Sequence, residues 1–148
     1  MSLWSRIERR LEGLYGDLIS DETQARIRAA RGLMAEGRFD QALPLLEEAL
    51  GERPDHPGAL SLLGTCHLEA GDTAAAIAAF DGALATTDIP EAMLGRATAK
   101  LMTAHISEAI AGFRAAQSAA GGDGDLLGQA YRGLGIAHLR AGDADKAV

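Results

Sequence analysis

A repeat of about 34 residues is the feature of this sequence that most restricts its fold. Residues 63–72 read LGTCHLEAGD and residues 134–143 read LGIAHLRAGD, an offset of 71 positions. Because 71 is about twice 34, the two copies are two repeats apart. Alanines confirm the period, since Ala42, Ala76, Ala109 and Ala147 follow one another at spacings of 34, 33 and 38.

The second helix of each of the first three units carries a pattern of small, large and small residues. An alanine is followed four residues later by a large apolar residue and seven residues later by a second alanine, and these offsets lie on one face of a helix. Gly37, Gly71 and Gly142 follow the preceding apolar segments and suit the left-handed position that ends a helix. Each unit is therefore predicted to be two short helices joined by a tight turn. The pattern is carried by Ala42, Leu46 and Ala49, by Ala76, Phe80 and Ala83, and by Ala109, Phe113 and Ala116.

Together these residues resemble the signature of the tetratricopeptide repeat (TPR) family over about residues 23–148. The match departs from the family pattern at His67, where an aromatic residue is usual, and at Ala104, where the turn glycine is usual. The resemblance implies an all-α fold, a right-handed α-solenoid of antiparallel helix pairs over residues 21–148. Its units are expected at about 23–56, 57–89 and 90–127, with a partial unit at 128–148. The second unit matches best, through Leu60, Leu63, Gly64, His67, Gly71, Ala76, Phe80 and Ala83.

Residues 1–20 precede the repeats and form a segment of their own. Apolar residues spaced three and four apart predict an amphipathic helix over residues 3–19. We expect this helix to cap the first repeat, and a seam between two such helices in a homodimer is the alternative. Its apolar face is formed by Trp4, Ile7, Leu11, Leu14 and Leu18.

The pattern places further helices along the rest of the chain, with a glycine-rich connection before the fourth unit. Gly121, Gly122 and Gly124 fall in that connection, which is predicted to be an extended loop between repeats. A phosphate-binding loop is disfavoured there, because no strand precedes it and no Lys-Ser/Thr pair follows. The helices are expected at residues 22–36, 39–52, 57–70, 73–87, 90–104, 106–119 and 126–141, with a further start at residue 144.

Charge, hydropathy and cysteine content restrict the partners and the cellular location of the chain. The formal net charge of -7 and the pI near 5.0 disfavour nucleic-acid binding, because an acidic surface repels phosphate. No apolar run approaches the roughly 18 residues of a membrane span, and residues 1–10 lack the pattern of a secretory signal. A single cysteine, Cys66, cannot form an intramolecular disulfide, which favours a reducing, cytoplasmic compartment.

The fourth unit is incomplete in this sequence. Its first helix carries Tyr131, Leu134 and Leu139, and little sequence follows to cover them. We therefore expect this chain to be a fragment of a longer protein, or its C-terminal end to be covered by another chain, for example in a homodimer.

No residues combine into a predicted catalytic, cofactor or metal site. Cys66 lies in the middle of an apolar helix, where a thiol packs as a small hydrophobic group and lacks a nearby cation to activate it. His67 and His138 occupy equivalent positions two repeats apart, too distant to share a metal ion. The chain is therefore not expected to be an enzyme.

The resemblance also implies a binding groove, because the first helix of each unit lines the concave side of the family's solenoid. Its mixture of aliphatic residues, methionines, hydroxyls and arginines suits an extended peptide or an amphipathic helix of another protein. The implied lining comprises Gln24, Ile27, Arg31 and Met34, then Ser61, Thr65, Leu68 and Glu69, then Glu91, Leu94, Thr98, Leu101 and Met102, and finally Gln129, Arg132, Ile136 and Arg140.

We therefore predict a non-catalytic protein–protein interaction module, and we keep two alternatives beside it. Some family members grip a terminal carboxylate with paired lysines and asparagines, but the corresponding positions here include Ile27, Ser61 and Leu94, so that specificity is not carried over. A secretion-type chaperone of the same family is one alternative. An accessory TPR arm of a larger enzyme, such as a transferase, is the other.

Overall fold

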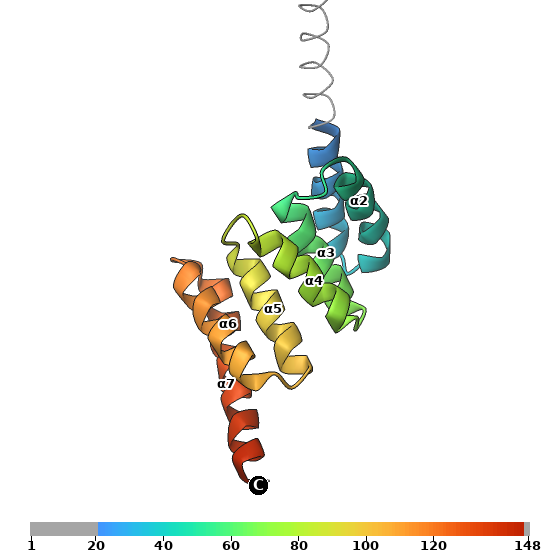
Figure 1. Cartoon of the computed structure of the whole chain (residues 1–148). Coiled ribbons are helices and arrows are strands. Elements are labelled where there is room, and N and C mark those ends of the chain that lie inside the picture. The colour runs from blue at the N-terminus through green and yellow to red at the C-terminus, as the bar shows by residue number, and fades with distance from the viewer. Residues whose placement is uncertain (1–20, 147–148) are drawn as a thin grey trace, which may run out of the picture. The chain divides into compact units, whose positions relative to one another are not determined.

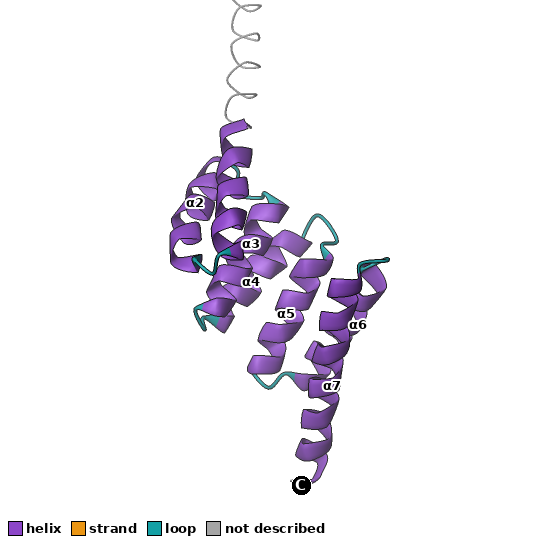
Figure 2. Ribbon diagram, turned by 180° about the vertical axis from the view of Figure 1, so that it is seen from behind, coloured by secondary structure: helices purple, strands orange, loops and turns teal. Residues whose placement is uncertain are grey.

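The structure, a computed structural model, describes residues 21–146 of the chain, with side chains to residue 142. The described residues contain helices and turns but no strand (Figure 2), which confirms the predicted all-α fold of helix pairs. The predicted helix over residues 3–19 lies outside the described residues. A helix over residues 21–35 is followed by α2 (Phe39–Glu52), α3 (Pro57–Glu69), α4 (Thr73–Leu84), α5 (Pro90–Met102), α6 (Ile106–Ala119) and α7 (Gly124–Lys146).

The chain divides into two compact units, Met1–Pro54 and Asp55–Val148. The division falls close to residue 56, where the sequence predicts the end of the first repeat. The described part of the first unit holds one helix pair, and the second unit holds α3 to α7.

In the first unit, a network around Arg26 joins α2 to the helix before it. The Arg26 guanidinium lies 2.6 Å from a carboxylate oxygen of Glu52, 2.7 Å from Glu22 and 3.2 Å from Glu48. The hydroxyl of Thr23, which is fully buried, donates a hydrogen bond to the other oxygen of Glu52. Glu52 is the last residue of α2, so these contacts hold its end against the neighbouring helix.

Acid should destabilise the first unit through Glu52. The Thr23 hydrogen bond and then the Arg26 guanidinium hold the pKa of Glu52 below its ordinary value, against the effect of burial. The ionised carboxylate therefore contributes stability above the unfolded pKa of about 4.3, and this contribution is lost as pH falls through the lower folded pKa. We expect Glu52→Gln to lower the melting temperature at neutral pH and to weaken its dependence on acid.

Thermal unfolding followed by circular dichroism across this pH range measures the effect. Glu47→Gln is the matched control, because it removes an exposed carboxylate of α2 that forms no ion pair among the described residues. If Glu52→Gln and the control shift the melting temperature equally, the role given to Glu52 is wrong.

In the second unit, each helix packs against the next one in the sequence (Figure 1). In addition α3 contacts α5, and α5 contacts α7, whereas α4 and α6 do not meet. The first helices of the successive pairs therefore lie side by side. Together α3, α5 and α7 present one continuous surface.

Two buried phenylalanine rings set how closely these helices approach. Phe80 is fully buried, and a Cβ atom added to Gly64 or Gly95 would lie 2.7 Å or 2.3 Å from its ring. Phe113 is 1% exposed, and a Cβ atom added to Gly133 would lie 2.4 Å from that ring. Glycine is thus required where α3, α5 and α7 meet the rings. The alanines and large residues of the predicted pattern are all buried, namely Ala42, Leu46, Ala49, Ala76, Phe80, Ala83, Ala109, Phe113 and Ala116.

The turns between paired helices confirm the predicted glycine positions and show how Ala104 replaces one. Gly37 and Gly71 have φ values of 76° and 83°, and Ala104 adopts the same left-handed region with φ 62°. This conformation costs a residue with a Cβ about 1–2 kcal/mol. The turn forms nonetheless, because the amide of His105 donates to the Lys100 carbonyl at 2.9 Å, as the corresponding amides do after Gly37 and Gly71.

The predictions around the fourth unit were wrong in two respects. The glycine-rich connection is a short turn over residues 120–123 rather than an extended loop, because the Asp123 carboxylate accepts hydrogen bonds from the amides of Asp125 and Leu126 and starts α7 early. In addition, α7 continues through Gly142, where a helix end was expected. Glycine within a helix costs only about 1 kcal/mol, so it permits a turn without enforcing one.

Candidate functional site

Two adjoining pockets lie along the surface that α3, α5 and α7 form in the second unit. The first has a volume of about 310 Å³ and the second about 250 Å³, and they share Leu94, Thr98 and Gln129. We call these two pockets together the groove. The remaining lining of the first pocket is Thr65, Leu68, Glu69, Glu91, Gly95 and Leu126, and that of the second is Leu101, Phe113, Arg132, Gly133 and Ile136.

Helix periodicity explains why these side chains face the same space. On α5, Leu94, Thr98 and Leu101 follow one another at offsets of four and three, and on α7 Gln129 and Ile136 are two turns apart. The hydroxyl of Thr98 donates to the Leu94 carbonyl at 2.9 Å, which leaves its methyl group as a lining surface. The groove therefore has an aliphatic centre built mainly by α5.

Charged side chains of opposite sign line the two pockets of the groove. Glu69 and Glu91 line the first pocket, and Arg132 lines the second. All three are exposed, and none forms an ion pair among the described residues. Charge of opposite sign is thus available to a ligand in the two pockets.

Most candidates from the second unit meet in the groove, and three do not line it. Ser61 is 7% exposed and belongs to the interior, whereas Met102 is 53% exposed at the end of α5. Arg140 donates a hydrogen bond from Nη1 to the Leu101 carbonyl at 2.9 Å. Its guanidinium therefore pairs with a backbone carbonyl near the C-terminal end of α5. The candidates in the first unit lie on the helix over residues 21–35, where Gln24 and Arg31 are exposed, Met34 is half-buried and Ile27 is buried.

Sequence reasoning missed Gly95, Leu126, Phe113 and Gly133 as lining residues. The two glycines each stand one residue after a predicted lining residue, and their lack of a Cβ atom lets the rings of Phe80 and Phe113 pack directly against the backbone of α5 and α7. The position of Gly95 directly after Leu94, and of Gly133 directly after Arg132, is the sequence signal that could have identified these two lining residues.

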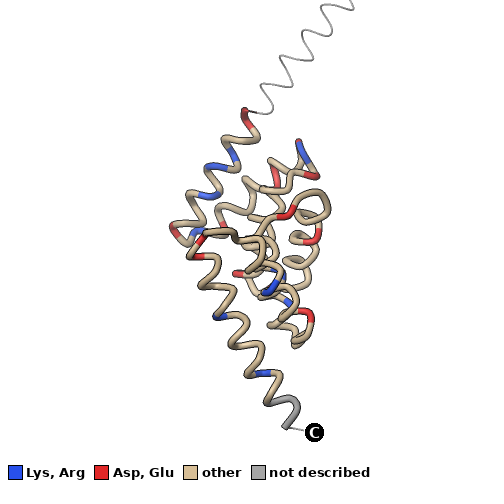
Figure 3. The backbone as a smooth tube through the Cα atoms, turned by 90° about the vertical axis from the view of Figure 1, so that its left-hand side faces the viewer, with Lys and Arg blue, Asp and Glu red and all other residues tan. Residues whose placement is uncertain are grey.

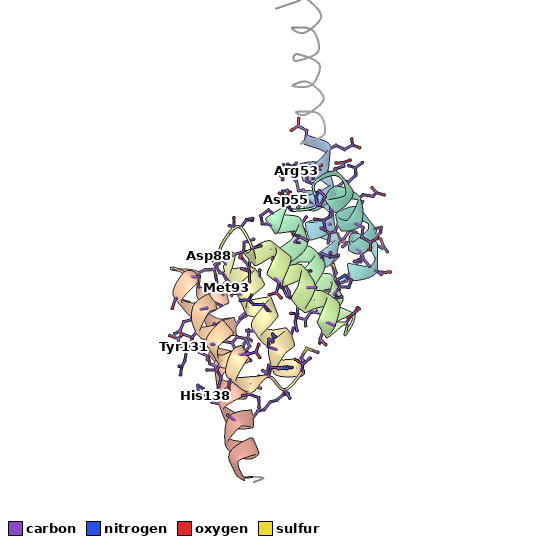
Figure 4. All side chains as sticks on the ribbon, in the orientation of Figure 1. Arg53, Asp55, Asp88, Met93, Tyr131 and His138 are labelled. Carbon is purple, nitrogen blue, oxygen red and sulfur yellow. The ribbon has the colours of Figure 1, made fainter. Side chains whose placement is uncertain are left out.

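The face of α7 turned away from the groove is partly uncovered, as the sequence predicted. Tyr131 is 59% exposed and Leu139 72% exposed, whereas Leu134 packs against the core. Tyr131 and His138 project outward from α7 (Figure 4). His138 is exposed because, among the described residues, no helix follows α7 to pack against it.

A larger pocket of about 400 Å³ lies between α4, α5 and α6. Its charges are already paired, since Arg96 lies 2.9 Å from Asp81 and Lys100 lies 2.9 Å from Glu108. The Lys100 hydrogen bond and charge lower the pKa of Glu108. The other lining residues are alanines and a glycine, so the polar part of the lining consists of these paired charges. For these reasons we regard the groove as the better candidate.

The described residues do not assemble a reactive centre. Cys66 is 3% exposed, and burial followed by the nearby Glu69 charge raises the pKa of its thiol, which is opposite to what a nucleophile requires. His105 forms a 2.9 Å hydrogen bond with the Thr103 hydroxyl beside it. No three His, Cys, Asp or Glu side chains gather to hold a metal ion in this part of the chain.

Residues 33–91 match the sequence model described as tetratricopeptide repeat. No curated protein matches the chain in sequence. None of the described helices combines the length and apolar composition needed to cross a membrane.

Solved structures of TPR domains are similar in fold to this chain. The first TPR domain of human RPAP3 is 12% identical with a TM-score of 0.75, covering 86% of this chain and 98% of that domain. The first TPR of Spaghetti (RPAP3), bound to an HSP90 peptide, is 15% identical with a TM-score of 0.72, covering 82% and 95%. The Yersinia enterocolitica type III secretion chaperone SycD, in complex with a peptide of the translocator YopD, is 18% identical with a TM-score of 0.71, covering 82% and 95%.

Proposed function

Because the chain is a tetratricopeptide repeat protein, we propose that it is a non-catalytic interaction module that binds a peptide or amphipathic helix of a partner protein. The binding site is the groove along α3, α5 and α7. The observation that carries this proposal is the pair of adjoining pockets that share Leu94, Thr98 and Gln129.

The groove has the composition that peptide recognition requires. Apolar side chains such as Leu68 and Ile136 bury the side chains of a ligand, and Gln129 and the charged lining residues can orient it. Two of the similar structures contain a bound peptide, one from HSP90 and one from YopD. Their sequence identities of 15% and 18% support the use of this fold for peptide binding without transferring either ligand to this chain.

Filling the groove should weaken binding strongly. Thr98→Arg places a long side chain where the two pockets meet, on a helix position that is half-buried rather than fully packed. We propose to select a phage-displayed library of random 12-residue peptides on the wild-type chain and to measure the enriched peptides by fluorescence polarisation. Thr98→Arg should weaken their binding by tenfold or more, which corresponds to about 1.4 kcal/mol.

Ala78→Arg is the matched control, because it introduces the same side chain at an exposed position of α4 outside the groove. Circular dichroism verifies that both variants remain helical. If no peptide is enriched, or if Thr98→Arg binds the enriched peptides as well as the control does, the proposed function is wrong.

Two broader predictions belong with this proposal. We propose a cytoplasmic location from the single buried Cys66. The secretion-type chaperone and the enzyme-associated arm stay as alternative settings for the same groove, since each would use it to hold a segment of another protein.

A further inference from the structure

We infer that the groove selects peptides in which a basic and an acidic side chain stand on either side of an aliphatic residue. This inference rests on the proposed function and specifies the ligand of the same site. It commits to one class of occupant, a linear segment of a partner protein with charges of both signs.

The first argument is the separation of charge along the groove. Glu69 and Glu91 come from the end of α3 and the start of α5, yet they line one pocket. Two carboxylates in one pocket repel each other and favour a cationic side chain between them. Because neither forms an ion pair among the described residues, a Lys or Arg of the ligand would be their first cationic partner.

The second argument is the basic charge in the other pocket. Arg132 lines the other pocket on α7, and its guanidinium can hold a carboxylate through two parallel hydrogen bonds. Figure 3 shows basic positions along the helix that leads to the C-terminus and an acidic position at its start. An acidic side chain of the ligand is therefore expected in this pocket.

The third argument is the aliphatic stretch between the charges. Leu94 and Thr98 belong to both pockets and so lie between the acidic and the basic residues, and Leu101 and Ile136 add apolar lining to the pocket of Arg132. An aliphatic ligand residue fits there, whereas a charged one would lose hydration without a partner. Packed helices lie about 8–10 Å apart and an extended chain rises about 3.3 Å per residue, so the two ligand charges should be about three to six positions apart.

The pocket between α4, α5 and α6 differs from the groove because its charged side chains already form ion pairs with one another. There Asp81, Arg96, Lys100 and Glu108 neutralise one another across the pocket, so a charged ligand would have to break existing ion pairs. In the groove, the acidic and basic residues line different pockets, and each remains available to the ligand.

Charge reversal in each pocket tests the inference. The library of random 12-residue peptides is selected in parallel on the wild-type chain, on the double variant Glu69→Lys/Glu91→Lys and on Arg132→Glu. The wild type should enrich sequences with one basic and one acidic residue around an aliphatic residue. The double variant makes both pockets basic and should enrich acidic residues on both sides, and Arg132→Glu should enrich basic residues on both sides.

Affinities measured by fluorescence polarisation give the size of the effect. A peptide selected on the wild type should bind the double variant about tenfold more weakly at low salt, because reversal replaces attraction by repulsion, and the difference should shrink as salt screens the charges. Asp40→Lys/Glu47→Lys is the matched control, since it makes the same change in net charge at exposed positions of α2. This control should bind the peptide like the wild type.

The outcomes separate this inference from the proposed function. If the enriched peptides require an open groove, judged by Thr98→Arg, but show the same charge pattern on all three chains, the charge inference is overturned and the interaction module stands. The same holds if the control weakens binding as much as Glu69→Lys/Glu91→Lys does. If no peptides are enriched at all, both proposals fall.

Discussion

Phe80→Ala is expected to destabilise the second unit by about 3–5 kcal/mol, the largest loss for any single substitution considered. The ring is fully buried between Gly64 of α3 and Gly95 of α5, and its cluster includes Ala76, Ala83 and Ala92. The buried members of the cluster are alanines, which cannot fill the space, whereas Leu60, Leu68, Leu84 and Ile89 pack against it from partly buried positions. A cavity therefore remains after partial relaxation, and its cost adds to the loss of apolar contact.

Urea denaturation followed by circular dichroism measures this loss. Leu139→Ala provides the control, because it also removes a large apolar side chain but from a position that is 72% exposed. It should change the unfolding free energy by less than about 0.5 kcal/mol. A similar change in both variants would contradict the burial assigned to Phe80.

Alanine substitutions at Gly133 and Gly135 should have opposite effects although the two residues lie on the same helix. A Cβ atom at Gly133 would lie 2.4 Å from the ring of Phe113, whereas a Cβ atom at Gly135 has nothing within 4 Å. A contact this short forces the ring or the helix to shift, so Gly133→Ala should destabilise by about 1–3 kcal/mol. Gly135→Ala should stabilise by up to about 1 kcal/mol, because alanine restricts the unfolded chain and favours the helix.

The same denaturation experiment tests this pair, and each substitution serves as the control for the other. Both remove one glycine and add one methyl group, so their intrinsic helix propensities change equally. If both variants are stabilised, the close approach of α7 to Phe113 is wrong. If both are destabilised, the uncovered surface at Gly135 is wrong.

The helix pairs were predictable because the signal for them is local. The spacing of Ala76, Phe80 and Ala83 defines one face of a helix wherever that helix lies, and the structure buries all three. The predicted bounds of 39–52 and 106–119 agree with those of α2 and α6. Ala104 could also be assigned to a turn, because the repeat period gives it the position in its unit that Gly71 has in the preceding unit.

The candidate site was predicted only in part, because the repeat identifies helix faces but not how adjacent helices are staggered. The first helices were expected to line one surface, and Thr65, Leu94, Thr98 and Ile136 do line the groove. Arg140 fulfils a different role, since its hydrogen bond to Leu101 depends on where α7 passes the end of α5.

Repetition in the amino-acid order was sufficient to establish paired helices, the buried face of each and the turn positions, since all of these follow from the spacing of residues within one repeat. The meeting of Glu69 with Glu91 in one pocket, the contact of Gly95 with the Phe80 ring and the unbroken course of α7 through Gly142 depended on packing between helices. Close approach of glycines to the Phe80 and Phe113 rings sets the distances between α3, α5 and α7. Those distances decide which side chains share a surface, and a repeat period does not encode them.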